Sequence, residues 1–317
     1  MSATTTSKTE AVLLPADGGR RPVPRPRRKG LLQFGHWWWA LPGILMVLAI
    51  HYVATAAGGV FAFTNWSGIG EFDWVGLENF EAIFTDPSKL LALWNTLFLA
   101  FASVLLANVA GLVIAVNLNR VLKSRYVLRT LFFMPVVLSP LATAYIWKFI
   151  FEFNGPLNVL LRGIGLGDLT RPWLADPQLA IWAILLVVVW QNIGFAMVIY
   201  MAGLAGVPQE IEEASAIDGA NLMQRFWHVT LPSIRPAIAI STTLGIVNGL
   251  RIFDQIMALT GGGPANATST LATEVYKQAF SLGSFGYGAA LALILTLIIL
   301  VFAVIQQRVS QGRPEAR

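Results

Sequence analysis

The chain has 317 residues, of which 56% are hydrophobic and only 12% are charged, and its formal net charge is +5. A soluble domain carries about a quarter charged residues, so this composition excludes an ordinary soluble protein and indicates an integral membrane protein. The sequence contains no cysteine, which excludes disulfides, thiolate nucleophiles and cysteine-based metal sites.

Residues 1–35 are polar and basic. Prolines and arginines concentrated between Arg20 and Lys29 disfavour a helix, and we expect a disordered cytoplasmic tail that helps to fix the membrane topology. A nucleic-acid-binding arm is the alternative. The apolar remainder of the chain disfavours it, and no nucleic-acid partner is expected.

Six apolar segments follow, each close to the ~20 residues that a helix needs to cross a bilayer. Unpaired backbone groups are too costly in lipid, so all six are predicted to be helices and the fold class is an all-α membrane protein. We expect one six-helix transmembrane domain over residues 36–308 and a short cytoplasmic tail at 309–317. The predicted crossings are 37–64, 91–116, 128–149, 179–204, 234–259 and 287–305.

Lysine and arginine are divided unevenly between the two sides of these crossings. Sixteen of the 22 lie in the two tails and in the loops after the second and fourth segments, whereas five lie in the opposite loops. Cytoplasmic loops carry an excess of these residues. Both termini and the loop at 205–233 are therefore predicted to be cytoplasmic.

The fourth apolar segment carries Trp190, Gln191 and Asn192 near its middle. Amides are poor lipid-facing groups, so we expect them to point into the protein or into a cavity. An aromatic ring beside amides also suits a sugar, whose ring face can stack and whose hydroxyls need hydrogen-bond partners. Hydrogen bonding between helices is the alternative, and the sequence leaves both open.

The loop at 205–233 is predicted to contain a short acidic helix. Acidic residues follow Pro208 in its first turn, as the helix dipole favours, and Gly219 is expected to end or bend the helix. A thin helix with small side chains can dock in a groove of another protein. Composition alone favours an ordinary amphipathic loop, whereas the residue spacing described below favours docking.

The fifth apolar segment contains Asn248, Arg251 and Asp254 at spacings that share one side of a continuous helix. An arginine inside a membrane helix costs ~2.5–3.5 kcal/mol on insertion scales, so it should face a water-filled cavity or pair with a carboxylate. Two interpretations stay open: an Arg251–Asp254 ion pair that fixes packing, and a polar path for a solute.

The sequence predicts no catalytic, metal or cofactor site. The three histidines, His36, His51 and His228, are scattered along the chain, and no Gly-Lys dipeptide of a phosphate-binding loop occurs. If ATP drives this protein, a partner subunit is expected to bind and hydrolyse it.

The spacing within the loop resembles the EAA coupling loop of ABC importer permeases, which reads Glu-Ala-Ala, three residues, Gly, nine residues, Ile, one residue, Leu-Pro. Ser215 stands for the second alanine and Val229 for the isoleucine. In that family the first short helix sits in a cleft of the ATPase subunit, and the Glu and Gly are important for coupling. The resemblance assigns ATPase coupling to Glu213, Ala214, Ser215, Asp218, Gly219, Leu231 and Pro232.

Residues 37–305 resemble the sugar-importing branch of these permeases, which contains maltose and glycerol-3-phosphate permeases. The segments that carry the resemblance include Trp94-Asn95-Thr96, Gly155-Pro156-Leu157-Asn158, Phe253-Asp254 and Thr260-Gly261-Gly262-Gly263-Pro264. The resemblance implies a type I importer permease fold in a bacterial-type cytoplasmic membrane. It also implies a lipid bilayer around the chain and three kinds of protein partner: a second permease that is a paralogue, an ATPase dimer and an extracytoplasmic solute-binding protein.

The function expected from the resemblance is import of a mono- or oligosaccharide. Its solute path is expected to include Trp190, Gln191, Asn192, Asn248, Arg251 and Asp254. A permease for another polar solute, such as a polyol or glycerol phosphate, is the first alternative. A stand-alone secondary transporter is the second, and it predicts inverted repeats or paired intramembrane acids, neither of which the sequence shows.

Overall fold

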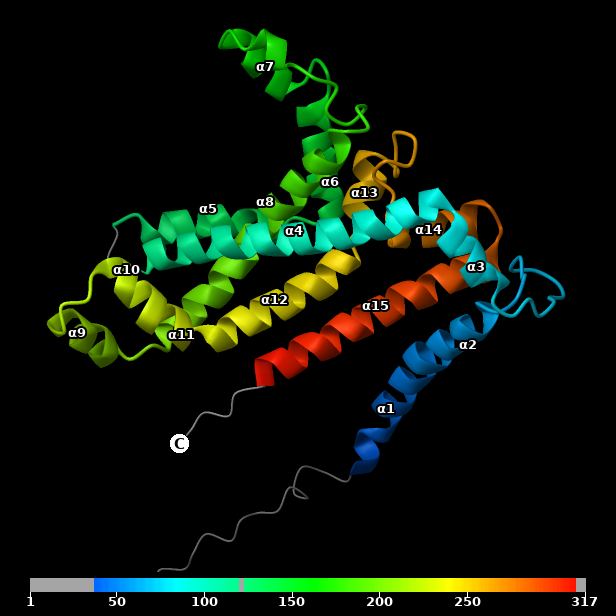
Figure 1. Cartoon of the computed structure of the whole chain (residues 1–317), viewed down its shortest axis with the longest axis horizontal. Helices are drawn as coiled ribbons and strands as arrows, with labels where there is room; N and C mark the ends of the chain where they lie inside the picture. The colour runs from blue at the N-terminus through cyan, green and yellow to red at the C-terminus, as the bar shows by residue number, and fades with distance from the viewer. Residues whose placement is uncertain (1–36, 120–122, 312–317) are drawn as a thin grey trace, which may run out of the picture. The chain divides into compact units, whose positions relative to one another are not determined.

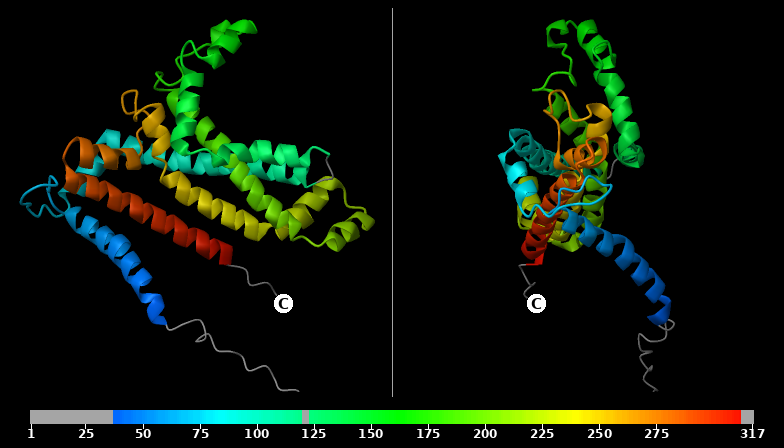
Figure 2. Two further views of the ribbon diagram at one scale, coloured as in Figure 1. Left: turned by 180° about the vertical axis from the view of Figure 1, so that it is seen from behind. Right: turned by 90° about the vertical axis from the view of Figure 1, so that its right-hand side faces the viewer.

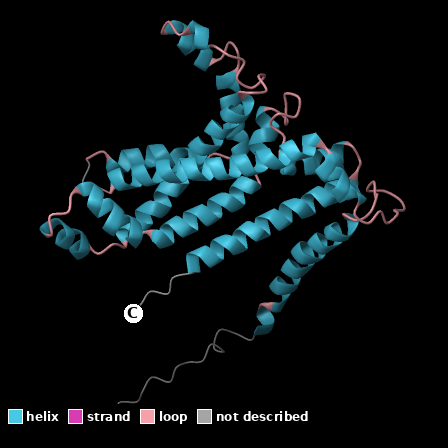
Figure 3. Cartoon of the chain, viewed as in Figure 1, coloured by secondary structure: helices cyan, strands magenta, loops and turns pink. Residues whose placement is uncertain are grey.

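The computed structural model describes residues 37–119 and 123–311. The regular secondary structure of this part of the chain is helical, and one isolated β-bridge joins Thr64 and Trp74 (Figure 3). The tail predicted at 1–35 lies outside the described residues. The last helix, α15 (Phe285–Gln311), continues through residue 311, while its membrane-spanning part is Phe285–Arg308.

The chain divides between Val53 and Ala54 into two compact units. The first unit contains a short turn at Trp37–Trp39, α1 (Leu41–Val47) and a π-helical turn at Leu48–Val53. Pro42 lies in the first turn of α1, where its missing N–H costs nothing. No described side chain of this unit is buried, which suits a helix whose solvent is lipid.

The second unit begins with α2 and carries all the remaining helices (Figure 1). In chain order they are α2 (Ala54–Phe61), α3 (Glu78–Thr85), α4 (Pro87–Leu118), α5 (Arg125–Val137), α6 (Pro140–Phe151), α7 (Pro156–Gly163), α8 (Ala180–Ala205), α9 (Gln209–Ile217), α10 (Leu222–Arg225), α11 (Leu231–Ser233), α12 (Arg235–Leu250), α13 (Asp254–Leu259), α14 (Leu271–Tyr276) and α15.

Four helical stretches among the described residues are long and apolar enough to cross a membrane: Leu41–Phe61, α4, α8 and Phe285–Arg308. Two bent pairs pass the same test together, which gives up to six crossings if each pair is one span. These pairs are Arg125–Val137 with Pro140–Gly163, bent by 100°, and Leu222–Ser233 with Arg235–Leu250, bent by 68°.

The crossing predicted over 128–149 corresponds to two helices with a sharp bend between them. The helix breaks between α5 and α6, where Leu138 and Ser139 adopt extended backbone conformations. A residue that precedes proline is driven out of the helical region, and Ser139 does precede Pro140. The Ser139 hydroxyl then accepts a hydrogen bond from the Ala142 N–H at 3.2 Å, which caps the new helix.

The crossing predicted over 234–259 corresponds to α12 and α13, and it differs from the prediction by an interruption at residues 251–253. The long helix α12 begins at Arg235, after a 68° bend. At the other end α12 stops at Leu250, and α13 begins only at Asp254. Asn248, Arg251 and Asp254 therefore do not share one face of a single helix.

Three long helices form the centre of the second unit. α4 packs against both α8 and α12, and α8 also contacts α5 (Figures 1 and 2). Glycine permits the closest approach of α12 to α4: a Cβ on Gly249 would lie 2.9 Å from the Ala100 Cα, and one on Gly245 would lie 3.0 Å from a Val104 methyl. Small residues commonly mediate close packing between membrane helices.

The segment after α13 is fastened to the start of α4. The Asn95 amide donates hydrogen bonds to the carbonyls of Ala267 and Ser269, both at 2.9 Å, and the Thr96 hydroxyl accepts one from the Leu271 N–H. These contacts join the Trp94-Asn95-Thr96 motif to the end of the loop that begins Thr260-Gly261-Gly262-Gly263. The loop is thus held as an ordered element at the end of the unit opposite α9 (Figure 1).

A buried ion pair strengthens the same junction. The Lys89 ammonium lies 2.7 Å from the Glu274 carboxylate, and these residues are only 8% and 1% exposed. Lys89 lies in the first turn of α4. Asp86, just before α4, caps that helix, and hydrogen bonds from Ser88 hold its pKa below the usual value.

Candidate functional site

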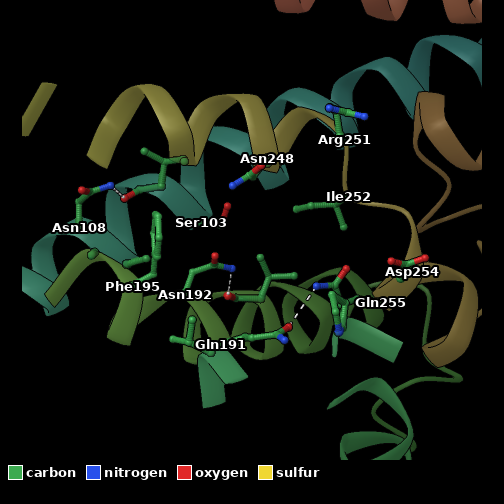
Figure 4. A pocket seen from close by; sticks show the side chains of 18 of the residues that line it. Ser103, Asn108, Gln191, Asn192, Phe195, Asn248, Arg251, Ile252, Asp254 and Gln255 are labelled. Atoms are coloured by element: carbon green, nitrogen blue, oxygen red, sulfur yellow. Dashed lines mark hydrogen bonds between the residues drawn. The ribbon is translucent and has the colours of Figure 1, made fainter. Parts of the chain in front are cut away.

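A cavity of about 480 Å³ lies between α4, α8, α12 and the start of α13 (Figure 4). Its lining is rich in amides and hydroxyls, although the helices that form it are mostly apolar. Of the six residues predicted for a solute path, five line this cavity: Gln191, Asn192, Asn248, Arg251 and Asp254. The breaks in the chain after α5 and after α12 both reach it, through Leu138 and Arg251.

Trp190 does not line the cavity. Its ring instead meets the ring of Trp147 edge-on, with centroids 5.5 Å apart. Helix geometry explains the difference, because neighbouring residues of α8 point in directions roughly 100° apart. When Gln191 and Asn192 line the cavity, Trp190 therefore points toward α6.

Sequence reasoning missed polar lining residues on other helices. Ser103 and Asn108 come from α4, Ser241 comes from α12, and Gln255 comes from α13. The sequence could have indicated them in the same way as Gln191 and Asn192, because each is a polar residue within an apolar segment. What the sequence could not show is that these four face the same space.

Some amides of the cavity are already occupied by contacts within the protein. Gln191 is 7% exposed. Its amide donates to the Leu138 carbonyl at 2.9 Å, and its oxygen accepts from Gln255 at 3.2 Å. Asn108 donates to the Val104 carbonyl and accepts from the Tyr200 hydroxyl. Gln191 thus joins α8 to the break before α6 and to α13, which is the hydrogen bonding between helices that the sequence left open.

Other groups in the cavity keep their hydrogen-bonding capacity. Among the described residues, the side chains of Asn248, Arg251 and Asp254 have no hydrogen-bond or ion-pair partner, and all three are exposed residues that border the cavity. The Arg251–Asp254 ion pair considered from the sequence does not form in the described structure. Asn192 uses only its N–H group, which donates to the Val188 carbonyl. The Asn248 amide points into the interior, whereas the Arg251 guanidinium and the Asp254 carboxylate lie at the edge of the cavity (Figure 4).

The loop predicted to dock on a partner forms a separate helical lobe, residues 209–225, at one end of the unit (Figure 1). Gly219 ends α9 with φ +80, a conformation that side chains with a Cβ rarely adopt. The Gly219 N–H donates to the Ala216 carbonyl and the Ala220 N–H to the Ser215 carbonyl, both at 3.1 Å. These two bonds form the Schellman motif that closes a helix end.

The next helix begins at once. Asn221 and Gln224 exchange hydrogen bonds in a capping box that starts α10. The predicted coupling residues fall into two groups. Glu213, Ala214, Ser215, Asp218 and Gly219 lie on α9 and its closing turn, whereas Leu231 and Pro232 form α11 at the root of the lobe. Leu231 is half-buried against a cluster that includes Tyr200 and Ile234.

The lobe exposes large apolar side chains as well as charge. Ile211, Ile217, Leu222 and Met223 are all exposed, as is Trp227 just after the lobe, and Ile217 is 87% accessible. A concentration of exposed apolar residues beside acidic ones is typical of a surface that contacts another protein. This geometry supports the prediction that the loop meets a partner.

Comparisons with known proteins agree with this architecture. The multiple sugar-binding transport system permease protein MsmF of Streptococcus mutans is 36% identical over 285 residues, covering 90% of this chain and 98% of that protein. The arabinooligosaccharides transport system permease protein AraP of Bacillus subtilis is 32% identical over 246 residues, covering 76% of this chain and 77% of that protein.

A chain in the crystal structure of a bacterial ABC transporter involved in alginate import superposes with a TM-score of 0.78 at 22% identity, covering 88% of this chain and 96% of that one. This likeness confirms the predicted type I importer permease fold. Residues 107–313 match the family model described as the binding-protein-dependent transport system inner membrane component. The chain belongs to this family of membrane-embedded transport components.

Proposed function

We propose that the chain is the transmembrane permease subunit of an ATP-driven, binding-protein-dependent importer of a carbohydrate. Family membership supports the transport role, and MsmF and AraP are named for sugar and arabinooligosaccharide transport. The observation that carries the proposal is the cavity, where Asn248, Arg251 and Asp254 present donors and acceptors with no partner among the described residues.

These groups match the chemistry of a sugar. A hydroxyl both donates and accepts hydrogen bonds, so a solute with many hydroxyls can satisfy the Asn248 amide, the Arg251 guanidinium and the Asp254 carboxylate together. Non-helical backbone at membrane depth is tolerated where it lines a water-filled cavity. The break between α12 and α13 fits this condition, because Arg251, Ile252 and Phe253 all line the cavity.

The remaining parts of the importer are assigned to partners. We infer a second permease that is a paralogue, an ATPase dimer that binds and hydrolyses ATP, and an extracytoplasmic solute-binding protein. The lobe at 209–225 is assigned to contact the ATPase, with both termini in the cytoplasm. This chain is assigned no catalytic, metal or cofactor role.

A second candidate substrate is an anionic solute such as glycerol phosphate. The specific observation that favours it is the Arg251 guanidinium at the edge of the cavity, which has no carboxylate partner among the described residues. Arginine is well suited to bind phosphate oxygens. The nearby Asp254 carboxylate opposes an anion, and for this reason we place a neutral carbohydrate first.

The proposal is tested by uptake. The complex, purified with its partner subunits and placed in vesicles with its binding protein, should import labelled mono- or oligosaccharides only when ATP is supplied. Glycerol phosphate is the matched anionic competitor. Import of glycerol phosphate without import of any carbohydrate would reverse the order of the two candidates, and sugar uptake that needs no ATP would contradict the importer assignment.

A further inference from the structure

A line of aromatic rings begins at the cavity and runs along the end of the unit opposite α9. Phe253 lines the cavity itself, and its ring centroid lies 5.5 Å from that of Tyr276, the last residue of α14. Phe280 follows at 5.6 Å and Phe285, the first residue of α15, at 6.1 Å. These four rings connect α13, α14 and α15.

The line continues onto the loop between α2 and α3. Trp66 lies 5.2 Å from Phe285, and Phe61 stacks on Trp66 at 4.2 Å. Phe72 follows at 5.7 Å from Phe61, and Trp74 at 6.1 Å from Phe72. We name these eight rings the aromatic ladder. Adjacent centroids lie near the 4.5–7 Å range of direct aromatic contacts, so each ring is in contact with the next.

Half of the ladder is exposed. Phe280 is 69% exposed, Trp74 66%, Tyr276 43% and Phe72 39%, whereas Phe253, Phe285, Trp66 and Phe61 are half-buried between them. A belt of interfacial aromatics would also be exposed, but it has no reason to form an unbroken series that ends in a polar cavity. The ladder does end there, because Phe253 is followed directly by Asp254, one of the partnerless groups of the cavity.

Polar groups accompany the exposed rings. Lys277 follows Tyr276, and its ammonium donates to the Asn266 side chain at 3.2 Å. Asp73 lies between Phe72 and Trp74 and accepts from the Asn65 amide at 3.3 Å. A sugar ring has an apolar face that stacks on an aromatic ring and hydroxyls around its edge that need polar partners. Rings flanked by an ammonium and a carboxylate supply both the stacking surface and the polar partners.

We propose that the aromatic ladder is a carbohydrate-binding surface that delivers sugar rings to the cavity. Its exposed rings stack on sugar units, and its half-buried rings hold the exposed ones in place. The inference rests on the proposed carbohydrate import. It adds a binding site outside the cavity and predicts a dependence on chain length, because a longer oligosaccharide contacts more rings at once.

The test replaces one open ring in the complete importer. Phe280→Leu keeps an apolar side chain but removes the ring face. At saturating loaded binding protein, the number of oligosaccharide molecules imported per ATP hydrolysed should fall about 2- to 10-fold, the factor that one lost aromatic contact gives. The loss should be smaller for the monosaccharide of the same series, and Phe280→Tyr should retain import. The probes are labelled malto- and arabino-oligosaccharides with their monosaccharides.

Phe84→Leu is the matched control, because Phe84 is an exposed phenylalanine of α3 outside the ladder. Equal import by the Phe280→Leu and Phe84→Leu importers overturns the ladder. A loss that is the same for all sugars and that follows weaker affinity for the binding protein also overturns it, since the surface would then dock a protein. A failure of the unaltered importer to move any carbohydrate instead removes the proposed function on which the ladder rests.

Discussion

At the scale of single residues, the cavity separates side chains that hold helices together from side chains that face its interior. Both polar atoms of the Gln191 side chain form hydrogen bonds, to Leu138 and Gln255, whereas the side chain of Asn248 has no partner among the described residues. Both are amides in apolar segments, so the sequence could not distinguish them. The difference lies in which carbonyls come within reach once the third segment breaks at residue 138.

This division predicts opposite effects for two similar substitutions. Gln191→Ala should leave the Leu138 carbonyl and the Gln255 amide without partners, and it should lower the free energy of unfolding by about 1–3 kcal/mol. Asn248→Ala should change stability by less than about 0.5 kcal/mol while slowing import. Thermal unfolding of the purified complex and uptake in vesicles measure the two effects. A stable Gln191→Ala variant together with an unstable Asn248→Ala variant would contradict the assignment.

Gly219 offers a second prediction at this scale. With φ at +80, replacement by alanine should cost about 1–2 kcal/mol in the closing turn of α9, which should speed hydrogen exchange in the lobe while leaving α8 protected. Gly206→Ala is the matched control, because Gly206 also follows a helix end but has φ −87. Equal exchange rates in the two variants would rule out a conformational requirement for glycine at 219.

At the scale of helices, hydropathy located the crossings but not their breaks. The segments at 91–116 and 179–204 correspond to α4 and α8. A long apolar segment forms a helix in lipid because only a helix pairs all of its backbone groups within the segment. The break before α6 had a readable cause, the residue before Pro140. The end of α12 at Leu250 had none, since residues 251–253 contain no proline or glycine. That end depends on packing at Gly249 and on the cavity, which are tertiary features.

The junction of α4 with α14 was also invisible to the sequence, because its two charges are 185 residues apart. Removing one partner of a buried ion pair leaves an uncompensated charge and typically costs ~3–5 kcal/mol, whereas replacing both partners is often close to neutral. We therefore expect Lys89→Met to lower the unfolding temperature of the complex strongly and Lys89→Met with Glu274→Gln to recover most of the loss. Equal damage in the single and double variants would show that the pair does not hold this junction.

At the scale of the whole molecule, two helices connect the lobe to the cavity within the second unit. α8 leads into the lobe and carries Gln191 and Asn192, while α12 leaves the lobe and ends beside Arg251 (Figures 1 and 4). The segment that would meet a motor subunit is thus continuous in the chain with two walls of the cavity. A displacement of α9 has a direct mechanical route to the residues proposed to face the solute.

The proposed route makes Glu213 the sharpest test. If α9 sits in a groove of the ATPase, Glu213→Lys reverses the charge presented to that groove, and sugar import by the assembled complex should be lost or fall steeply. Asp168→Lys is the matched control, since it makes the same charge change at an exposed site after α7, away from the lobe. Uptake and ATP hydrolysis are measured together: import lost while hydrolysis continues indicates uncoupling, and both lost indicates failed assembly. A normal import rate in the Glu213→Lys complex would mean that force does not enter through this lobe, and the cavity would then need another connection to its motor.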